Sequence, residues 1–122
     1  MKHLIIAKWN EGVDKKAMLA PVKEIFDRTL EIPGIHAVSV VPCCIDRPNR
    51  YDILIEIDMD PEALSAYDAS APHKEWKDRY GNLLAAKAIF DRSQEHVPCC
   101  PGSASRCSSH PGRGEMGQGK ED

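Results

Sequence analysis

YDILIEIDM, residues 51–59, alternates apolar and polar side chains, with Leu54 as the one apolar residue among the polar positions. Successive side chains of a β-strand point to opposite sides of a sheet, so this pattern predicts a strand with one buried face. That face is formed by Tyr51, Ile53, Ile55, Ile57 and Met59. This is the clearest strand in the chain, and the other elements can be placed around it.

Three further stretches are predicted as strands because they are short, apolar and rich in branched residues. They are KHLIIAKW (2–9), IHAVSVV (35–41) and KAIFD (87–91). Between the first two, Asp14 can cap a helix that runs to about Glu31 with apolar residues at helical spacing. Pro21 lies inside that span, so the helix either kinks there or restarts with the proline in its first turn.

Two more helices are predicted after the strand at 51–59. Residues 60–62 (DPE) supply a cap, a proline at the first helical position and an acid in the first turn, which favours a short helix to about Asp68. Residues 70–72 (SAP) start the next helix by the same chemistry. That helix is predicted to end at Tyr80, with Gly81 just beyond it as the terminating glycine.

The resulting order is strand, helix, two strands, two helices and a last strand. It predicts an α+β domain with a four-stranded antiparallel sheet and helices on one face, as in ferredoxin-like folds. Both faces of the sheet carry apolar residues, since Leu4 and Ile6 oppose Ile5 and Ala7 on the first strand. Such a sheet needs a second cover, and a second copy of the chain is the simplest one. We therefore expect a homodimeric α+β barrel.

Length and composition limit the remaining possibilities. The 122 residues predict one folded domain over residues 1–95 and a tail over 96–122. The tail is rich in Gly, Ser and Pro and poor in large apolar residues, so it is predicted to be disordered. The net charge of -3 argues against a nucleic-acid partner. The apolar run at the start is too short for a signal peptide or a membrane span, so we expect a cytoplasmic protein without a membrane partner.

The five cysteines include two adjacent pairs, Cys43–Cys44 and Cys99–Cys100. Adjacent cysteines meet disulfide geometry poorly, and reduced thiols are expected in the absence of a secretion signal. The tail adds His96, Cys107 and His110 as possible zinc ligands. It lacks the apolar residues that would support a zinc site, so we expect no metal and no cofactor.

One stretch, YDASAPHKEW (67–76), carries residues suited to acid–base chemistry. His73 falls in the first turn of its predicted helix, where the positive end of the helix dipole disfavours a charged imidazole and suits a general base. Tyr67 could donate a hydrogen bond to a carbonyl oxygen as negative charge develops there. The same residues also fit a corner between two helices, with Tyr67 packed on Trp76 or Leu64, and base rates favour this structural interpretation.

Taken in order, several stretches resemble the stress-responsive A/B barrel family. They are KHLIIAKW, IPGIHAVSV, YDILIEIDM, EALSAYDASAPHKEW and KAIFD, which together span residues 1 to about 94. The resemblance implies a homodimer in which two sheets face each other, with a cavity between the helices and the sheet of each subunit.

The family is functionally mixed, and one plant member is a cofactor-free polyketide cyclase. Its pocket holds a tyrosine and a histidine at the spacing of Tyr67 and His73, and His3 matches another of its histidines. The resemblance therefore implies Tyr67 and His73 as catalytic residues and His3 and Trp76 as supporting ones. Where that enzyme has a pocket tyrosine and a pocket histidine, this chain has Ile25 and Ile53, so its pocket is less polar.

Three functions follow as expectations. The first is a small dimeric barrel protein that binds a small hydrophobic ligand in an apolar pocket. The second is a cofactor-free cyclase or lyase that uses His73 and Tyr67. The third is a cofactor-free monooxygenase, since related dimeric barrels include such enzymes.

Overall fold

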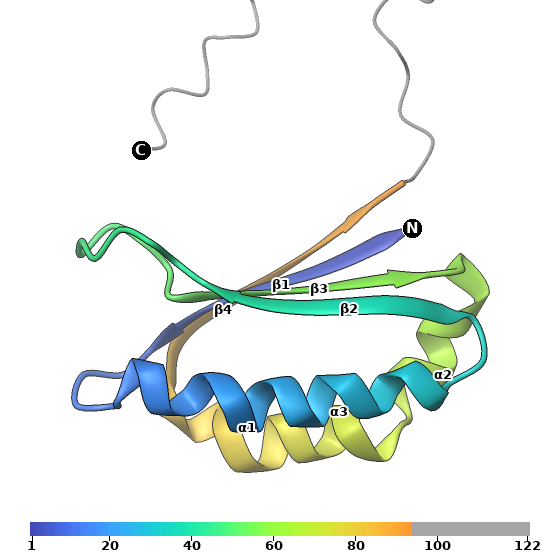
Figure 1. The fold of residues 1–122 in the computed structure, drawn as a ribbon, viewed down its shortest axis with the longest axis horizontal. Coiled ribbons are helices and arrows are strands. Elements are labelled where there is room, and N and C mark those ends of the chain that lie inside the picture. The colour runs from blue at the N-terminus through green and yellow to red at the C-terminus, as the bar shows by residue number, and fades with distance from the viewer. Residues whose placement is uncertain (94–122) are drawn as a thin grey trace, which may run out of the picture.

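The computed structural model describes residues 1–93, so the predicted disorder of 96–122 and the zinc ligands of the tail lie outside the described residues. Four strands form one sheet in the order β2-β3-β1-β4, and every neighbouring pair is antiparallel (Figure 1). The strands are β1 (Lys2–Trp9), β2 (Ile35–Pro42), β3 (Ile53–Met59) and β4 (Leu84–Arg92). All helices lie on one face of the sheet (Figure 1), which confirms the predicted ferredoxin-like α+β architecture.

The first helix, α1 (Lys15–Asp27), begins as predicted. The Asp14 carboxylate accepts a hydrogen bond from the backbone N–H of Ala17 at 3.2 Å, which satisfies one of the free donors at the helix start. Pro21 lies within α1, so the helix does not restart at the proline. A 3₁₀ turn over Arg28–Glu31 completes the helical segment to the predicted end.

The second helical segment is less regular than the sequence predicts. It consists of a 3₁₀ turn (Pro61–Ala63), α2 (Leu64–Asp68), α3 (Ala71–Glu75), a π-helix (Trp76–Tyr80) and a 3₁₀ turn (Gly81–Leu83). Gly81 has an ordinary right-handed helical conformation, with φ at -55°, so its predicted role as a left-handed terminator is wrong. The Asp60 side chain makes no capping hydrogen bond and instead lies 3.0 Å from Nε2 of His36.

The core lies between the helices and the inner faces of β1 and β3. The predicted alternation is confirmed for Ile53, Ile55, Ile57 and Met59, which are all buried. It is wrong for Tyr51, which precedes β3, is half-buried and lines a pocket with Leu54 and Ile6. In β2, simple alternation would place Ile35 on the face opposite Val38 and Val40. A register shift between Ile35 and Ala37 brings Ile35 to the inner face as well. A β-bulge of this kind inserts one residue and so changes which side chains face the core.

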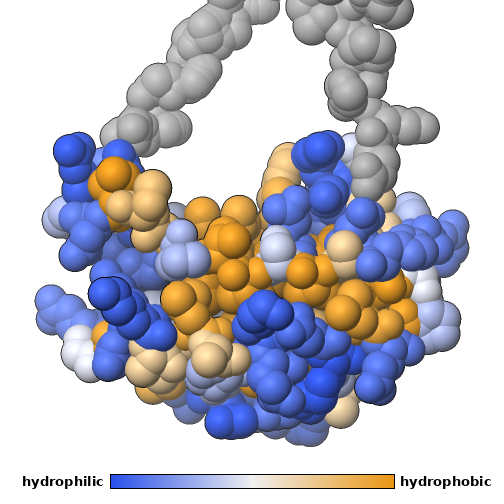
Figure 2. Space-filling view, viewed as in Figure 1, coloured by the Kyte–Doolittle hydropathy of each residue, from blue (hydrophilic) through white to orange (hydrophobic). Residues whose placement is uncertain are grey.

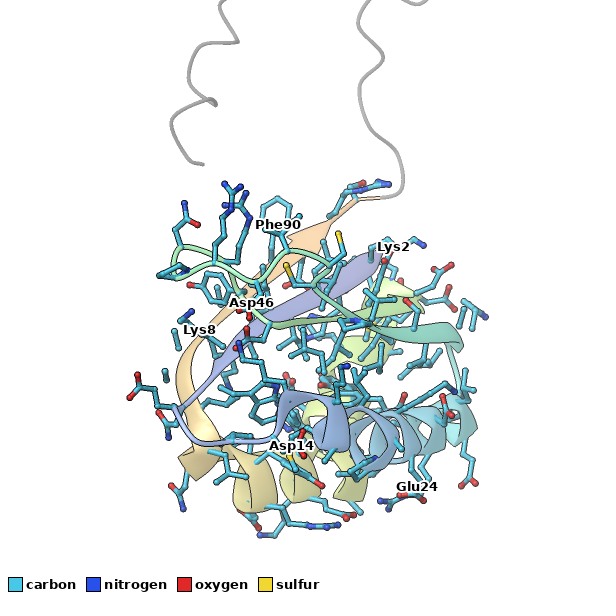
Figure 3. All side chains as sticks on the ribbon, turned by 60° about the vertical axis from the view of Figure 1, so that its left-hand side comes forward. Lys2, Lys8, Asp14, Glu24, Asp46 and Phe90 are labelled. Atoms are coloured by element: carbon cyan, nitrogen blue, oxygen red, sulfur yellow. The ribbon has the colours of Figure 1, made fainter. Side chains whose placement is uncertain are left out.

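Among residues 1–93 no helix covers the outer face of the sheet, which remains partly apolar. Exposed apolar side chains on this side include Ile6, Val41 and Phe90, and Phe90 is 64% exposed. Phe90 points away from the helices (Figure 3), and apolar residues form a band at the level of the sheet (Figure 2). Within residues 1–93, no helix is long and apolar enough to cross a bilayer.

Candidate functional site

Four side chains from β4, β1, α2 and α3 form a row of contacts in the order Asp91, His3, Tyr67 and His73. His3 comes from β1 and is only 5% exposed, and the strand register places it opposite Asp91 of β4. Nδ1 of His3 lies 2.5 Å from Oδ1 of Asp91. A carboxylate oxygen only accepts hydrogen bonds, so Nδ1 donates this one. Asp91 thus fixes the orientation of His3.

Tyr67 lies between two imidazole rings. Its ring centroid is 5.2 Å from that of His3 and 4.8 Å from that of His73. The side chain is fully buried, and its hydroxyl has no hydrogen-bond partner among the described residues. Burial, with a smaller contribution from the charge of Asp68, raises the pKa of Tyr67 well above its usual value. The phenol therefore stays protonated near neutral pH and is available as a hydrogen-bond donor.

His73 is held at the start of α3 by two local contacts. The Ser70 hydroxyl accepts a hydrogen bond from the backbone N–H of His73 at 3.3 Å, and ring Nδ1 lies 3.0 Å from the carbonyl oxygen of Asp68. A carbonyl can only accept, so Nδ1 donates and Nε2 keeps its lone pair. Burial lowers the pKa of His73, while the contact with Asp68 raises it and two lysines lower it further. A neutral ring suits a general base, and burial is the largest cause that favours it here.

The predicted pair, Tyr67 and His73, is thus in contact, and His3 joins it. The ring contacts of Tyr67 are with two histidines, and Trp76, one of its two predicted packing partners, is not among them. Trp76 packs against Phe26 in the core. The sequence analysis missed Asp91: only the register of β1 against β4 shows that this acid faces His3.

Two other residues that were predicted to lie in the pocket, Ile25 and Ile53, are not part of this row of contacts. Ile25 is fully buried in the core. Ile53 is also buried, and it contributes to the wall of a pocket on the other side of the sheet.

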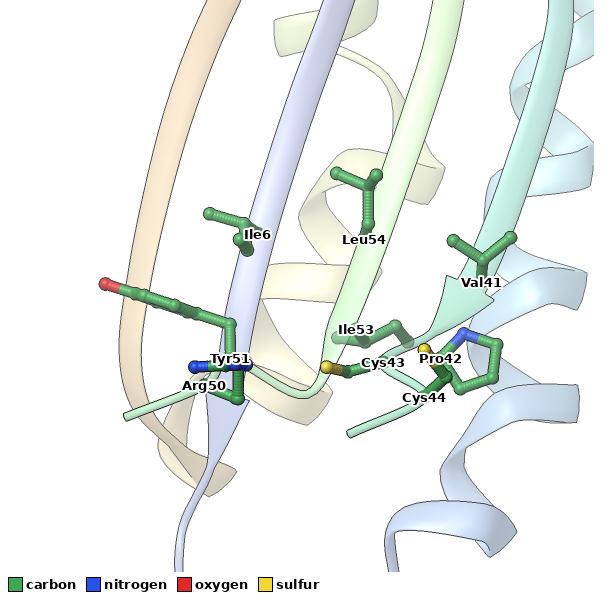
Figure 4. Close-up of a pocket in the computed structure, with 9 residues that line it drawn as sticks. All are labelled: Ile6, Val41, Pro42, Cys43, Cys44, Arg50, Tyr51, Ile53 and Leu54. Atoms are coloured by element: carbon green, nitrogen blue, oxygen red, sulfur yellow. The ribbon is translucent and has the colours of Figure 1, made fainter. Parts of the chain in front are cut away.

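That cavity, which we call the outer-sheet pocket, has a volume of about 360 Å³ and is lined by the nine residues drawn in Figure 4. Ile6, Leu54 and Val41 come from three adjacent strands and lie side by side along it (Figure 4). Cys43 and Cys44 come from the loop that follows β2. Among its lining residues Arg50 is the one charged side chain, so the pocket is suited to an apolar molecule.

A second cavity of about 500 Å³ lies between the start of α1 and the same loop. Leu19 and Ile45 supply its apolar walls, and Lys15 and Asp52 form an ion pair of 3.0 Å at its edge. The wall of this second cavity also contains Lys16 and Asp46, so it is more polar than the wall of the outer-sheet pocket. Neither cavity is lined by Tyr67 or His73.

Within the part of the chain that the structure describes, no group of three or more His, Cys, Asp or Glu side chains could hold a metal ion. The row Asp91–His3–Tyr67–His73 has the composition of an acid–base site. It contains one carboxylate, two imidazoles and one phenol that stays protonated near neutral pH. Such groups can move a proton without a metal when a substrate lies against them.

The architecture defines the chain as an α+β protein of the ferredoxin-like class. No family model and no curated protein matches it. Solved structures do match, at sequence identities that show the fold alone. A dimeric protein of unknown function and ferredoxin-like fold from Bacteroides fragilis aligns with a TM-score of 0.64 and 15% identity, over 75% of this chain and 93% of that one.

Two further matches are proteins with a named activity. A candidate antibiotic biosynthesis monooxygenase from Bacteroides thetaiotaomicron has a TM-score of 0.61 and 19% identity, over 83% of this chain and 93% of that one. A hydroxynitrile lyase from Passiflora edulis has a TM-score of 0.60 and 10% identity, over 79% and 95%. One fold therefore serves proteins of different activities, and the activity of this chain has to be argued from its own residues.

Proposed function

We propose that this chain forms a homodimeric α+β barrel of the stress-responsive A/B barrel type and binds a small hydrophobic molecule in the outer-sheet pocket. The observation that carries the proposal is the pocket itself. Its walls are almost entirely apolar, and its volume of about 360 Å³ falls in the range typical of small-molecule sites.

The position of the pocket supports the homodimer. The pocket opens on the face of the sheet that no helix covers, beside the exposed apolar side chains of that face. A second copy of the sheet placed over this face would bury those side chains and close the pocket. The Bacteroides fragilis protein with the same fold is dimeric, which is consistent with this arrangement.

Ligand binding can be tested with an uncharged fluorescent probe such as N-phenyl-1-naphthylamine. We expect saturable fluorescence enhancement with the wild-type protein and a loss of at least about tenfold in affinity for Val41→Asp, because a charge in the wall is poorly solvated there. Leu30→Asp is the matched control, since Leu30 is exposed to a similar degree on the helical side and lines neither cavity described above. Equal affinities for the two variants, or no binding to the wild type, would contradict the proposal.

A second candidate is cofactor-free proton abstraction by His73, of the kind that cyclases and lyases use. The observation in its favour is the Tyr67 hydroxyl, which is buried without a partner in the described chain. An unsatisfied buried hydroxyl destabilises a protein by about 1–3 kcal/mol, so it requires an explanation. A substrate carbonyl would supply the missing acceptor.

The chemistry of this second candidate follows from the tautomers. Nε2 of His73 would take a proton from a carbon next to a carbonyl, and the electron pair would move onto the carbonyl oxygen. The phenol of Tyr67 would donate a hydrogen bond to that oxygen as its charge develops. His3, oriented by Asp91, would lie on the opposite side of the phenol.

Nuclear magnetic resonance (NMR) titration of His73 tests this coupling. In the wild type we expect a pKa below the ordinary histidine value, and in Tyr67→Phe we expect that pKa to move. A pKa that is indifferent to the tyrosine hydroxyl would show that YDASAPHKEW is only a corner between helices. The monooxygenase alternative rests on fold likeness alone, because no residue in the described chain favours it.

A further inference from the structure

Two thiols lie in the wall of the outer-sheet pocket, and ligand binding alone does not account for them. Cys43 and Cys44 are both exposed in the single chain, and both line this pocket. A thiol in the wall of a pocket is a nucleophile, and it can react with a bound ligand if that ligand is electrophilic.

We propose that Cys43 covalently captures apolar α,β-unsaturated carbonyl compounds in the outer-sheet pocket. This inference rests on the proposed function in one respect, which is that the ligand enters this pocket. It adds the chemical class of the ligand and the atom that reacts with it.

Cys43 is the better placed of the two thiols. Its backbone N–H donates to the carbonyl oxygen of Asp52 at 2.9 Å, which continues the pairing of β2 with β3 by one residue. Its Sγ lies 3.3 Å from the carbonyl oxygen of Ile45, so the thiol has a defined position. Figure 4 shows the Cys43 side chain directed toward the side of the pocket that Tyr51 occupies. Cys44 follows in the loop, beyond the end of β2.

The pocket would select the ligand by its apolar tail and hold its polar end near the loop. Ile6, Leu54 and Val41 form a continuous apolar wall across three strands. Arg50 contributes the cationic group among the lining residues, and a guanidinium is a suitable hydrogen-bond donor to a carbonyl oxygen. A ligand with an apolar chain and an enone at its end would place the chain against the apolar wall and the carbonyl group near Arg50.

The reaction is a conjugate addition in which atoms and electrons balance. The sulfur forms a bond to the β-carbon, and the electrons of the carbon–carbon double bond move through the α-carbon onto the carbonyl oxygen. The proton that the thiol loses ends on the α-carbon, which restores the carbonyl group. The step requires no oxidant, reductant or cofactor.

Two vinyl ketones with the same reactive group test the proposal. The first is 1-octen-3-one, hereafter octenone, which carries a five-carbon apolar tail on its carbonyl group. The second is methyl vinyl ketone, which has a methyl group in place of that tail. We would treat the full-length protein with each compound and measure alkylation rates at Cys43 and Cys44 separately, by peptide mapping with mass spectrometry. Cys43→Ser and Cys44→Ser give a matched pair, since the two residues are adjacent and both exposed.

For each cysteine we compare the alkylation rate by octenone with that by methyl vinyl ketone. We expect this ratio to be about tenfold or more higher at Cys43 than at Cys44, because prior binding places the ligand against the Cys43 thiol. Cys44→Ser should keep this preference, and Cys43→Ser should lose it. Val41→Asp should slow octenone at Cys43, and Leu30→Asp, at a residue that lines neither cavity, should leave the rates of both compounds unchanged. An equal effect of the tail at both cysteines would overturn the proposal.

The failures of the two proposals are distinguishable. If the naphthylamine probe binds and the tail has no selective effect at Cys43, covalent capture is wrong and ligand binding stands. If the probe does not bind, the proposed function is wrong. Covalent capture, which requires that the ligand enters this pocket, would then fail with it.

Discussion

The buried hydroxyl of Tyr67 predicts an unusual response to a conservative substitution. In the folded protein the ring packs between His3 and His73, while the hydroxyl has no partner in the described chain. Tyr67→Phe keeps the ring and removes the unsatisfied group, so we expect stability to be unchanged or raised, by up to about 1–3 kcal/mol. Urea unfolding measures this change. A loss of more than about 1 kcal/mol would mean that the hydroxyl has a partner in the folded protein.

His73 predicts a pH dependence of stability. Burial lowers its pKa in the folded protein below the ordinary value of 6.5, so the unfolded chain binds this proton at a higher pH. Stability attributable to His73 is therefore complete above pH 6.5. It declines as the pH falls through that value and is fully lost below the lowered folded pKa.

We expect His73→Phe, which keeps a ring against Tyr67, to reduce the loss of stability between pH 7.5 and pH 5. The measurement is urea unfolding at both pH values. His36→Phe is the control, because His36 lies on β2 and its side chain is 57% exposed. The interpretation fails if the two substitutions change the pH dependence equally.

The same residues show how far the sequence could predict the site. Tyr67 and His73 could be predicted because local sequence signals indicate the short helix, the turn after it and the start of the next helix. Asp91 was missed because its role depends on the register of β1 against β4, which places residues 88 positions apart at 2.5 Å. Hydrophobic alternation predicts that a strand exists, but it does not predict which residue of the neighbouring strand lies opposite.

At the scale of elements, two glycines with left-handed backbones provide a matched comparison. Gly12 and Gly34 have φ values of 89° and 93°. A methyl group at Gly34 would come within 2.9 Å of Cβ of Ala63, whereas one at Gly12 would meet no atom within 4 Å. Both substitutions to alanine force a side chain into a disfavoured conformation, at a cost of about 1–2 kcal/mol.

Gly34→Ala should therefore cost about 1–3 kcal/mol more than Gly12→Ala, because it also pushes the turn before β2 away from the segment after β3. Thermal or urea unfolding of the two variants gives the difference. Equal losses would show that this contact relaxes freely and that only the backbone conformation matters.

The elements that the sequence predicted well are those with strong local signals. The alternation of β3, the Asp14 cap and Pro61 at a helix start each depend on neighbouring residues. The π-helix over Trp76–Tyr80 had no such signal. It places both aromatic side chains in the core, where Trp76 packs on Phe26 and Tyr80 packs on Trp9. The segment predicted as a helix to Tyr80 is helical over Ala71–Tyr80, but its last five residues form a π-helix because tertiary packing of this kind overrides local propensity.

For the whole molecule, the uncovered face of the sheet predicts the state of association. Helices bury one face, and the other carries Phe90 at 64% exposure together with Ile6 and Val41. We expect the wild-type protein to sediment as a dimer at micromolar concentration, because association removes this apolar area from water. Phe90→Asp should shift it to a monomer, since a carboxylate buried in such an interface would be unpaired. Leu30→Asp, at 45% exposure on the helical side, should remain a dimer. A monomeric wild type would exclude the barrel, and a Phe90→Asp dimer would place the interface elsewhere.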